Sequence, residues 1–185
     1  MNPPIDITGI VLRTPRLTLR PWQPTDLEDF YTYARVEGVG QMAGWCPHKS
    51  IEESRQILEL FLQGKRTFAL EYEGQVIGSL GVEAYDEEHY PELAALAGRE
   101  IGYVLSKEFW GRGLMPEAVR AVLGWLFGSV GLDFVLVGHF DWNRQSARVI
   151  EKCGFAPIKV CPYETRYGTI EKSEESILYN PFRAR

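Results

Sequence analysis

Apolar and polar residues alternate along several short segments of the chain, a pattern typical of half-buried β-strands. The first segment, R-L-T-L-R-P-W at 16–22, ends at Pro21, which has no N–H to donate to a strand ladder. A turn-forming Glu73-Gly74 pair joins two later segments and predicts a hairpin. The alternation predicts strands at 16–22, 67–72, 75–85, 100–105, 134–140, 155–160 and 175–179.

Between these segments, apolar residues recur every three or four positions, which predicts helices with one buried face. Thr25 or Asp26 is placed to cap the first helix, and the S-I-E-E string from Ser50 is a capping-box pattern for the second, which Gly64 ends. The four helices are predicted around 27–34 and at 50–64, 115–127 and 143–152.

The order of these elements indicates a fold class. Helices gather early, strands dominate the middle, and a strand–turn–helix–strand–helix unit fills 100–154. This order predicts an α/β (α+β) domain whose mixed central sheet is mostly antiparallel, flanked by helices, and contains one parallel or splayed pair. No repeat or linker interrupts the pattern, so we expect a single domain over 1–185. Residues 86–98 are predicted to form a loop with a helical turn.

Composition narrows the classes of partner. The formal net charge of -5 argues against a nucleic-acid binder and suits a cationic or amine partner. The three cysteines, Cys46, Cys153 and Cys161, form no CxxC pair, so no metal site is expected and a reducing compartment is indicated. With no signal-like N-terminus and no membrane-length apolar run, we expect a cytoplasmic protein that does not bind membranes.

The segment E-F-W-G-R-G-L-M-P-E-A at 108–118 carries the first candidate chemistry. A strand leads into a short loop, with Gly111 and Gly113 two residues apart, and a helix follows at once. Helix N-termini offer unpaired amides and a positive dipole end to phosphates, although such a loop is often only a tight turn. No P-loop string exists, and Pro116 stands where a dinucleotide fingerprint needs its third glycine. The pyrophosphate of coenzyme A remains a candidate ligand, with Arg112 as an additional positive contact.

A second candidate functional segment is N-R-Q-S-A-R-V-I-E-K-C-G-F at 143–155. Asn143 is a natural N-cap, Ser146 lies one turn later and Gly154 is a C-cap. Read alone, Asn143 is only a cap and Ser146 is only a first-turn serine.

Together, these segments resemble the GNAT superfamily of N-acetyltransferases. The resemblance extends over nearly the whole chain and rests on E-I-G-Y-V-L, the W-G-R-G-L turn and N-x-x-S-x-x-x-x-x-x-x-G-F. The opening R-T-P-R-L-T-L-R-P-W is similar to the branch of ribosomal-protein alanine N-acetyltransferases. The resemblance implies transfer of an acetyl group from acetyl-CoA to a primary amine, of a protein N-terminus or of a small molecule. A monomer and a homodimer both stay open.

The resemblance also implies roles for residues of the two segments. The backbone of 103–105 would pair with the pantetheine arm, and amides of 111–116 would hold the pyrophosphate, with none from Pro116. Asn143 would hydrogen-bond the pantetheine, Ser146 would lie near the sulfur, and a strand amide such as that of Val104 would stabilise the oxyanion. The residues implied in coenzyme binding are Tyr103, Val104, Leu105, Gly111, Arg112, Gly113, Leu114, Met115, Pro116, Asn143 and Ser146.

Two positions depart from the family pattern. Glu108 stands where Gln or Arg is common, which removes one side-chain contact. Ile150 replaces a tyrosine that serves many members as general acid, so Ser146 becomes the candidate donor to the thiolate. The absence of this tyrosine motivates an alternative function, a non-catalytic sensor that binds acyl-CoA.

Glu100, at the start of the strand before the glycine loop, is the candidate general base. An ordinary exposed carboxylate at a strand end is an equally weighted alternative for this residue. Two further sets of residues are candidates for an amine-binding mouth and an acceptor lid: Glu83, Asp86, Glu87, Glu88 and His89 for the mouth, and Trp45, Cys46 and His48 for the lid.

Overall fold

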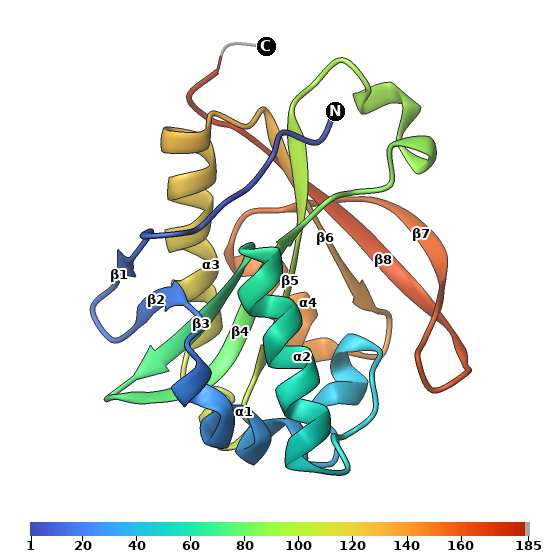
Figure 1. Cartoon of the computed structure of the whole chain (residues 1–185). Coiled ribbons are helices and arrows are strands. Elements are labelled where there is room, and N and C mark those ends of the chain that lie inside the picture. Colours follow the sequence, from blue (N-terminus) through green and yellow to red (C-terminus); the bar gives the residue numbers. More distant parts are fainter. Residues whose placement is uncertain (184–185) are drawn as a thin grey trace.

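The sheet of the protein has eight strands in the order β1-β2-β3-β4-β5-β6-β8-β7 (Figure 1). The structure, a computed structural model, describes residues 1–183. Neighbouring strands are antiparallel except for β5 and β6, which are parallel. The strands are β1 (Leu12–Arg13), β2 (Thr18–Pro21), β3 (Thr67–Tyr72), β4 (Gln75–Glu83), β5 (Gly98–Leu105), β6 (Phe134–Phe140), β7 (Ala156–Glu164) and β8 (Ile170–Tyr179).

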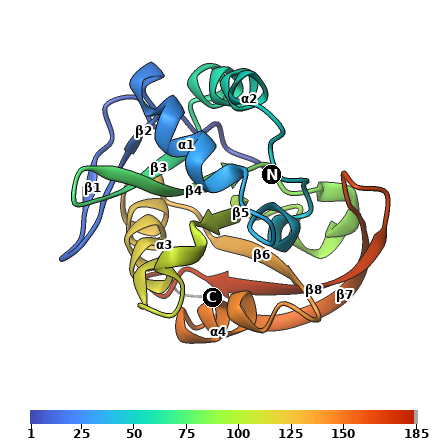
Figure 2. The ribbon, with the colours of Figure 1, turned by 90° about the horizontal axis from the view of Figure 1, so that it is seen from below.

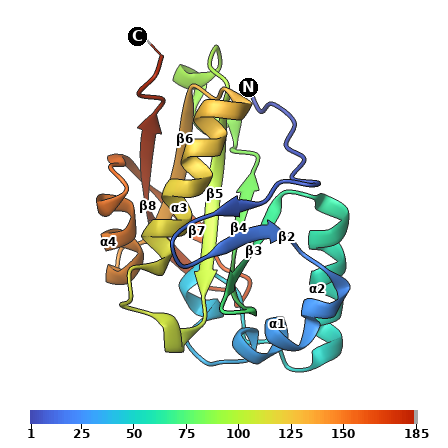
Figure 3. The same ribbon diagram turned by 90° about the vertical axis from the view of Figure 1, so that its left-hand side faces the viewer.

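In the described part of the chain, four α-helices cover the two faces of the sheet. α1 (Leu27–Ala34) and α2 (Ile51–Gly64) lie on one face, and α3 (Leu114–Trp125) and α4 (Arg144–Lys152) lie on the other (Figure 3). The mixed, mostly antiparallel sheet with flanking helices confirms the predicted fold class.

Burial of one apolar face fixes α3 on the sheet. Leu114, Val119 and Val122 are at most 1% exposed and belong to the same core cluster as Leu80 and Ile101 of the sheet. Full burial of such a side chain stabilises the fold by about 1.5–3 kcal/mol. The N-terminus of α3, and the loop that leads into it, are therefore held firmly against the sheet.

The parallel pair is short, and this opens the sheet. β5 and β6 pair only at Gly98–Phe134, Arg99–Val135 and Glu100–Leu136. Beyond these pairs β5 continues along β4 and β6 continues along β8, so the two strands separate toward their C-terminal ends (Figures 1 and 2). The predicted parallel or splayed pair is thus both parallel and splayed.

Several boundaries differ from the predicted ones. β1 was not predicted, because two residues are too short to show alternation. The predicted helix at 115–127 ends at Trp125 and continues as a π-helical turn over Leu126–Val130. The predicted loop at 86–98 contains two short 3₁₀ turns, Glu87–His89 and Pro91–Leu93. β7 and β8 form a longer hairpin than predicted, because Pro162 in β7 and the polar residues at 171–174 in β8 hide the strand pattern.

Candidate functional site

A cavity of about 440 Å³ lies where β5 and β6 separate. Its volume is within the range usual for small-molecule sites. All the residues predicted for catalysis and coenzyme binding line it, except Arg112. Its wall includes Glu100, Tyr103, Val104, Leu105, Gly111, Gly113, Leu114, Met115, Pro116, Asn143 and Ser146 from the predicted set, and also Val39, Met42, Ala43, His139, Gln145, Arg148, Lys152, Tyr163, Ser173 and Glu175.

The glycine loop presents backbone amides to one end of this cavity. Gly111 and Gly113 have φ angles of +75° and +76°, which favour glycine, and Gly113 is the N-cap of the twelve-residue helix α3. No side chain caps this helix, so its first amides face the cavity mouth without a side-chain partner. Such an end suits an anion.

Two cations missed by the sequence prediction lie near the same wall. Arg148 and Lys152 project from α4 into the cavity lining at helical spacing, together with Gln145 and Val149. The spacing of 145, 148, 149 and 152 marks one helix face and would have identified them. Arg112, in contrast, does not line the cavity: its guanidinium lies over the Phe109 ring, 5.0 Å from the centroid.

The direction of the β5 backbone decides which of its amides face the gap. The Ser106 amide donates to Ile77 of β4 at 2.7 Å, and the Val104 carbonyl is directed at Gly78 of β4. In an antiparallel ladder the N–H and C=O of a residue point the same way, so the Val104 amide also faces β4. The open side therefore takes the backbone groups of Tyr103 and Leu105, and the Leu105 carbonyl already accepts from Trp110 Nε1 at 2.7 Å.

Asn143 caps α4, as its position in the sequence predicted. Its Oδ1 accepts from the Ser146 amide at 3.1 Å. Its Nδ2 donates to the Met42 carbonyl at 3.2 Å, which links the start of α4 to the Gly40–Ala43 turn. Asn143 is buried, so both contacts are shielded from water.

Ser146 is held by a residue that the sequence did not suggest as its partner. The Ser146 Oγ and the Tyr103 hydroxyl lie 2.8 Å apart, across the gap between α4 and β5. Burial is the main reason that the pKa of the Tyr103 hydroxyl lies well above its usual range, so it acts as a neutral hydrogen-bonding group. Ile150, at the position where many family members carry a tyrosine, is a buried core residue.

Carboxylates gather on the opposite side of the gap. Burial, followed by the charges of Glu175 and Glu83, raises the pKa of Glu100 to about 7. Glu175 of β8 reaches this wall because its register partner on β6 is Gly138, where a Cβ would come within 2.7 Å of Glu175 Oε1. The Tyr90 hydroxyl donates to Glu175 at 3.5 Å. Glu175 was not predicted, because its register with Gly138 cannot be read from one sequence.

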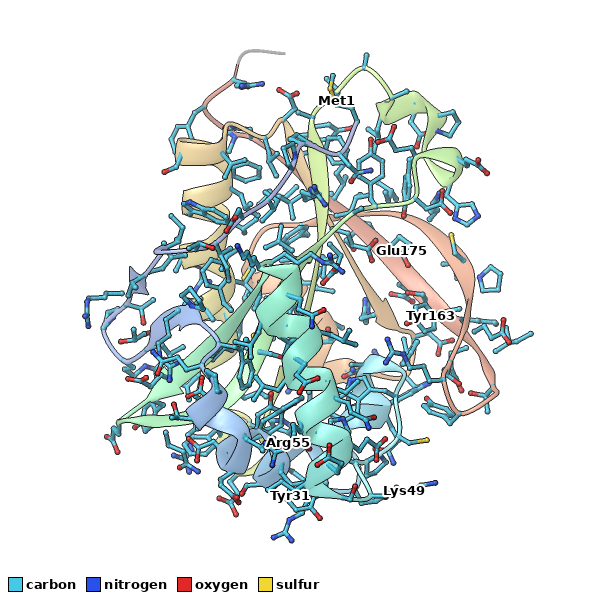
Figure 4. All side chains as sticks on the ribbon, viewed as in Figure 1. Met1, Tyr31, Lys49, Arg55, Tyr163 and Glu175 are labelled. Carbon is cyan, nitrogen blue, oxygen red and sulfur yellow. The ribbon has the colours of Figure 1, made fainter. Side chains whose placement is uncertain are left out.

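Two segments meet over this part of the cavity. The Arg166 amide donates to the Gly44 carbonyl at 2.8 Å, and the Tyr167 hydroxyl donates to Gln41 at 3.4 Å. The tip of the β7–β8 hairpin is thereby joined to the Gly40–Ala43 turn. Tyr163 lies nearer that tip and Glu175 farther from it (Figure 4). Met42 and Ala43 of the turn line the cavity, whereas the predicted lid residues Trp45, Cys46 and His48 do not.

The remaining candidates lie outside the cavity wall. Glu83 pairs with Arg66, and Asp86 caps a 3₁₀ turn through the Glu88 amide. Burial raises the pKa of the Cys153 thiol, which disfavours the nucleophilic thiolate. Over residues 1–183 no group of His, Cys, Asp and Glu is arranged to hold a metal ion. None of the helices in that range combines the length and apolar character needed to cross a bilayer.

Comparisons with known proteins agree on one family. The family model described as "Acetyltransferase (GNAT) domain" matches residues 16–156. The "Uncharacterized N-acetyltransferase p20" of Bacillus licheniformis is 26% identical over 152 residues, which cover 78% of this chain and 81% of that protein.

Solved structures share the fold at low identity. The ribosomal-protein-S5-alanine acetyltransferase from Vibrio fischeri superposes with a TM-score of 0.72 at 20% identity, covering 95% of this chain and 100% of that one. The microcin C7 self-immunity acetyltransferase MccE, solved with acetyl-CoA and AMP, gives a TM-score of 0.75 at 18% identity, with coverage of 90% of this chain and 93% of that one.

Proposed function

Because the chain belongs to the family of GNAT-domain acetyltransferases, we propose that it transfers an acetyl group from acetyl-CoA to a primary amine. The amine belongs to a protein N-terminus or to a small molecule. One observation carries this proposal: a single cavity is lined by a helix N-terminus without a side-chain cap, the open side of β5, a serine hydroxyl and a carboxylate with a raised pKa. The family match and the likeness to MccE support acetyl-CoA as the donor.

In this proposal the coenzyme lies along the gap between β5 and β6. Amides of the loop from Gly111 and of the first turn of α3 bind the pyrophosphate, and Arg148 and Lys152 add positive charge. The open-side backbone of Tyr103 pairs with the pantetheine arm. Since the Val104 amide faces β4, we assign the oxyanion contact to an amide of the open side, such as that of Tyr103.

The chemical step needs a neutral amine, because an ammonium has no lone pair. Glu100 accepts the proton that the ammonium loses, the new C–N bond forms, and the C–S bond breaks. The attacking nitrogen loses its second proton as the amide forms, and this proton passes to the thiolate, which leaves as the thiol; the Ser146 hydroxyl donates a hydrogen bond to the sulfur. A carboxylate with a pKa of about 7 is well matched to a proton transfer near neutral pH.

The acceptor arrives, in this proposal, from the side of Glu100 and Glu175. Two carboxylates favour a cationic amine there. Val39, Met42 and Ala43 form an apolar part of the wall, which suits a small apolar group beside the amine. The similar Vibrio fischeri protein is an alanine acetyltransferase of a ribosomal protein, which supports including a peptide N-terminus among the acceptors.

We also propose a domain organisation and a cellular compartment for the chain. We assign the activity to one domain over 1–185, because both motifs border the same cavity and the family match covers 16–156. The three cysteines are free, which supports the expected reducing environment of the cytoplasm.

The first experiment is thermal unfolding with acetyl-CoA, with NAD and ATP as controls. A ligand of the native state at one hundred times its dissociation constant adds about 2.7 kcal/mol of stability. Thiol release is then measured with a peptide carrying an N-terminal alanine and with small amines. Stabilisation with turnover that Glu100→Gln abolishes supports the proposal. Stabilisation without turnover on any amine supports the sensor alternative, and no stabilisation contradicts both.

A further inference from the structure

Gly102, in the middle of β5, is a glycine that the backbone does not require. Its φ lies outside the positive range that favours glycine, and the strand around it is extended. Glycine weakens a strand interior, because it has no side chain to pack and loses more conformational freedom on folding than any other residue. A glycine at such a position is explained where another group approaches the backbone closely.

The surroundings of Gly102 contain no such group from the protein itself. Within residues 1–183, the glycines of the strands are Gly78, Gly81, Gly98, Gly102 and Gly138. At four of them an added Cβ would come within 3.0 Å of an atom of another residue, which explains the glycine by packing. At Gly102 no atom lies within 4 Å of the added Cβ. Gly102 is exposed and lines the cavity, so the space above it is open to a ligand.

The face of β5 on which this space lies indicates its occupant. Side chains alternate along a strand, and Ile101 and Tyr103 pack against the core cluster of α3. Gly102 therefore lies on the opposite face, which it shares with Glu100, the proposed base. Ser146, the proposed donor to the sulfur, contacts Tyr103 on the α3 side. The space over Gly102 is thus on the side of the acceptor amine and not on that of the coenzyme.

The spacing along the strand brings the acceptor close to this space. Glu100 and Gly102 are two residues apart, which corresponds to about 7 Å. An amine nitrogen that binds the Glu100 carboxylate has its own carbon one bond away, so the substituents of that carbon reach the space over Gly102. The Gly40–Ala43 turn lies beside β5, and its residues Met42 and Ala43 line the same cavity. The space is therefore bounded by apolar groups and suits a small apolar substituent.

We propose that Gly102 is a specificity-determining residue for the acceptor. Because it has no side chain, it leaves room for a small apolar substituent on the carbon that carries the attacking amine. This inference rests on the proposed function. It names the acceptors as primary amines on a substituted carbon, and it assigns their selection to a position in β5.

Thiol release with two acceptors that differ by one methyl group tests this assignment. Alaninamide carries the substituent and glycinamide lacks it. Gly102→Ala should lower the ratio of kcat/KM for alaninamide to kcat/KM for glycinamide by about tenfold, the lower end of the discrimination that one carbon contributes in a pocket. Gly124→Ala adds the same methyl group at an exposed position of α3 outside the cavity wall, and should leave this ratio unchanged.

Two further measurements show that Gly102→Ala acts on the acceptor alone. The variant should unfold at a higher temperature than the wild type, because the strand loses a glycine and the added methyl group meets no atom. Calorimetric titration should give the same affinity for coenzyme A, because the methyl group lies on the opposite face of β5. A lower unfolding temperature or a weaker coenzyme A affinity would contradict this placement of the space.

Propionyl-CoA separates the acceptor from the acyl group as the occupant. An unchanged acceptor ratio in Gly102→Ala, together with a lower preference for propionyl-CoA over acetyl-CoA, would place the acyl chain over Gly102 and overturn the inference. An acceptor ratio that stays unchanged with either donor would also overturn it and leave the proposed function standing. Failure of the wild type to turn over any amine would remove the proposed function and this inference together.

Discussion

The hydroxyl groups of Tyr103 and Ser146 lie 2.8 Å apart, one from β5 and one from the first turn of α4. This contact ties the strand that faces the proposed pantetheine arm to the helix that carries the proposed donor to the sulfur. The orientation of the Ser146 hydroxyl thus depends on a tyrosine of the strand, in a chain whose α4 has isoleucine at position 150.

We expect Ser146→Ala to lower kcat about a hundredfold, because the departing thiolate loses its donor. Tyr103→Phe should lower kcat only about fivefold, because it removes the group that orients the serine. The double variant should resemble Ser146→Ala, since the two residues act through one hydrogen bond. The measurement is thiol release at saturating acetyl-CoA. Fully additive losses would show that the two hydroxyls act independently.

The pKa of Glu100 predicts the pH dependence of kcat/KM for the amine. A base with a pKa of about 7 is protonated and inactive below that value, so kcat/KM should rise with pH through about 7. Glu175→Gln removes a neighbouring negative charge that helps to raise this pKa, and should move the rise to lower pH. Glu164→Gln, at an exposed position of β7, is the control and should leave it in place. A rise that stays in place in Glu175→Gln would contradict this assignment.

The raised pKa of Glu100 also predicts how the stability of the protein depends on pH. The pKa of Glu100 is raised on folding, so the stability associated with its protonated form is present below about pH 4.5 and is lost as pH rises through about 7. Glu100→Gln, which stays neutral, should therefore exceed the wild type in free energy of unfolding at pH 8, by on the order of 2 kcal/mol.

At pH 4 the two proteins should unfold alike. Urea unfolding at both pH values measures the difference, with Glu59→Gln on the exposed part of α2 as the matched control. Glu100→Gln being less stable than the wild type at pH 8 would show that the ionised carboxylate is stabilised in the fold instead.

Glycine at 111 and 113 is required by the backbone. Both have φ near +75°, so alanine at either position should cost about 1–2 kcal/mol of stability and disturb the amides offered to the pyrophosphate. Gly124→Ala, at an exposed position near the end of α3 where the chain continues into the π-helical turn, has no atom within 4 Å of the added Cβ and should instead stabilise by about 0.5–1 kcal/mol. Denaturant unfolding and coenzyme A titration of the three variants check these signs, and a neutral Gly113→Ala would argue against a positive-φ requirement.

The fold and much of the site could be predicted from the sequence because their signals are local. Alternation marked β3 to β6, capping patterns marked α2 and α4, and the two motifs placed Glu100 and Ser146 in a common unit. The site residues that were not predicted depend on the register between strands that lie far apart in the sequence. Glu175 reaches Glu100 only through pairing with Gly138, and His139 meets Glu174 only through the same β6–β8 ladder. One sequence carries no record of that alignment.

Asn143 has two roles that one pair of variants can separate. It caps α4 through Oδ1, and its Nδ2 ties the helix start to Met42. Asn143→Ala loses both contacts and should lower the free energy of unfolding by about 1–2 kcal/mol. Asn143→Ser keeps a capping oxygen, but its side chain is too short to reach the Met42 carbonyl, so most of the stability should return.

The KM for the amine tests the second role. Both variants should raise it, because the Gly40–Ala43 turn that lines the acceptor side loses its link to α4. Coenzyme A affinity tests the pantetheine contact that the family resemblance implies for Asn143. The affinity should fall about fivefold in both variants, since the serine also lacks the amide. If Asn143 is only a cap, Asn143→Ser should bind coenzyme A as tightly as the wild type.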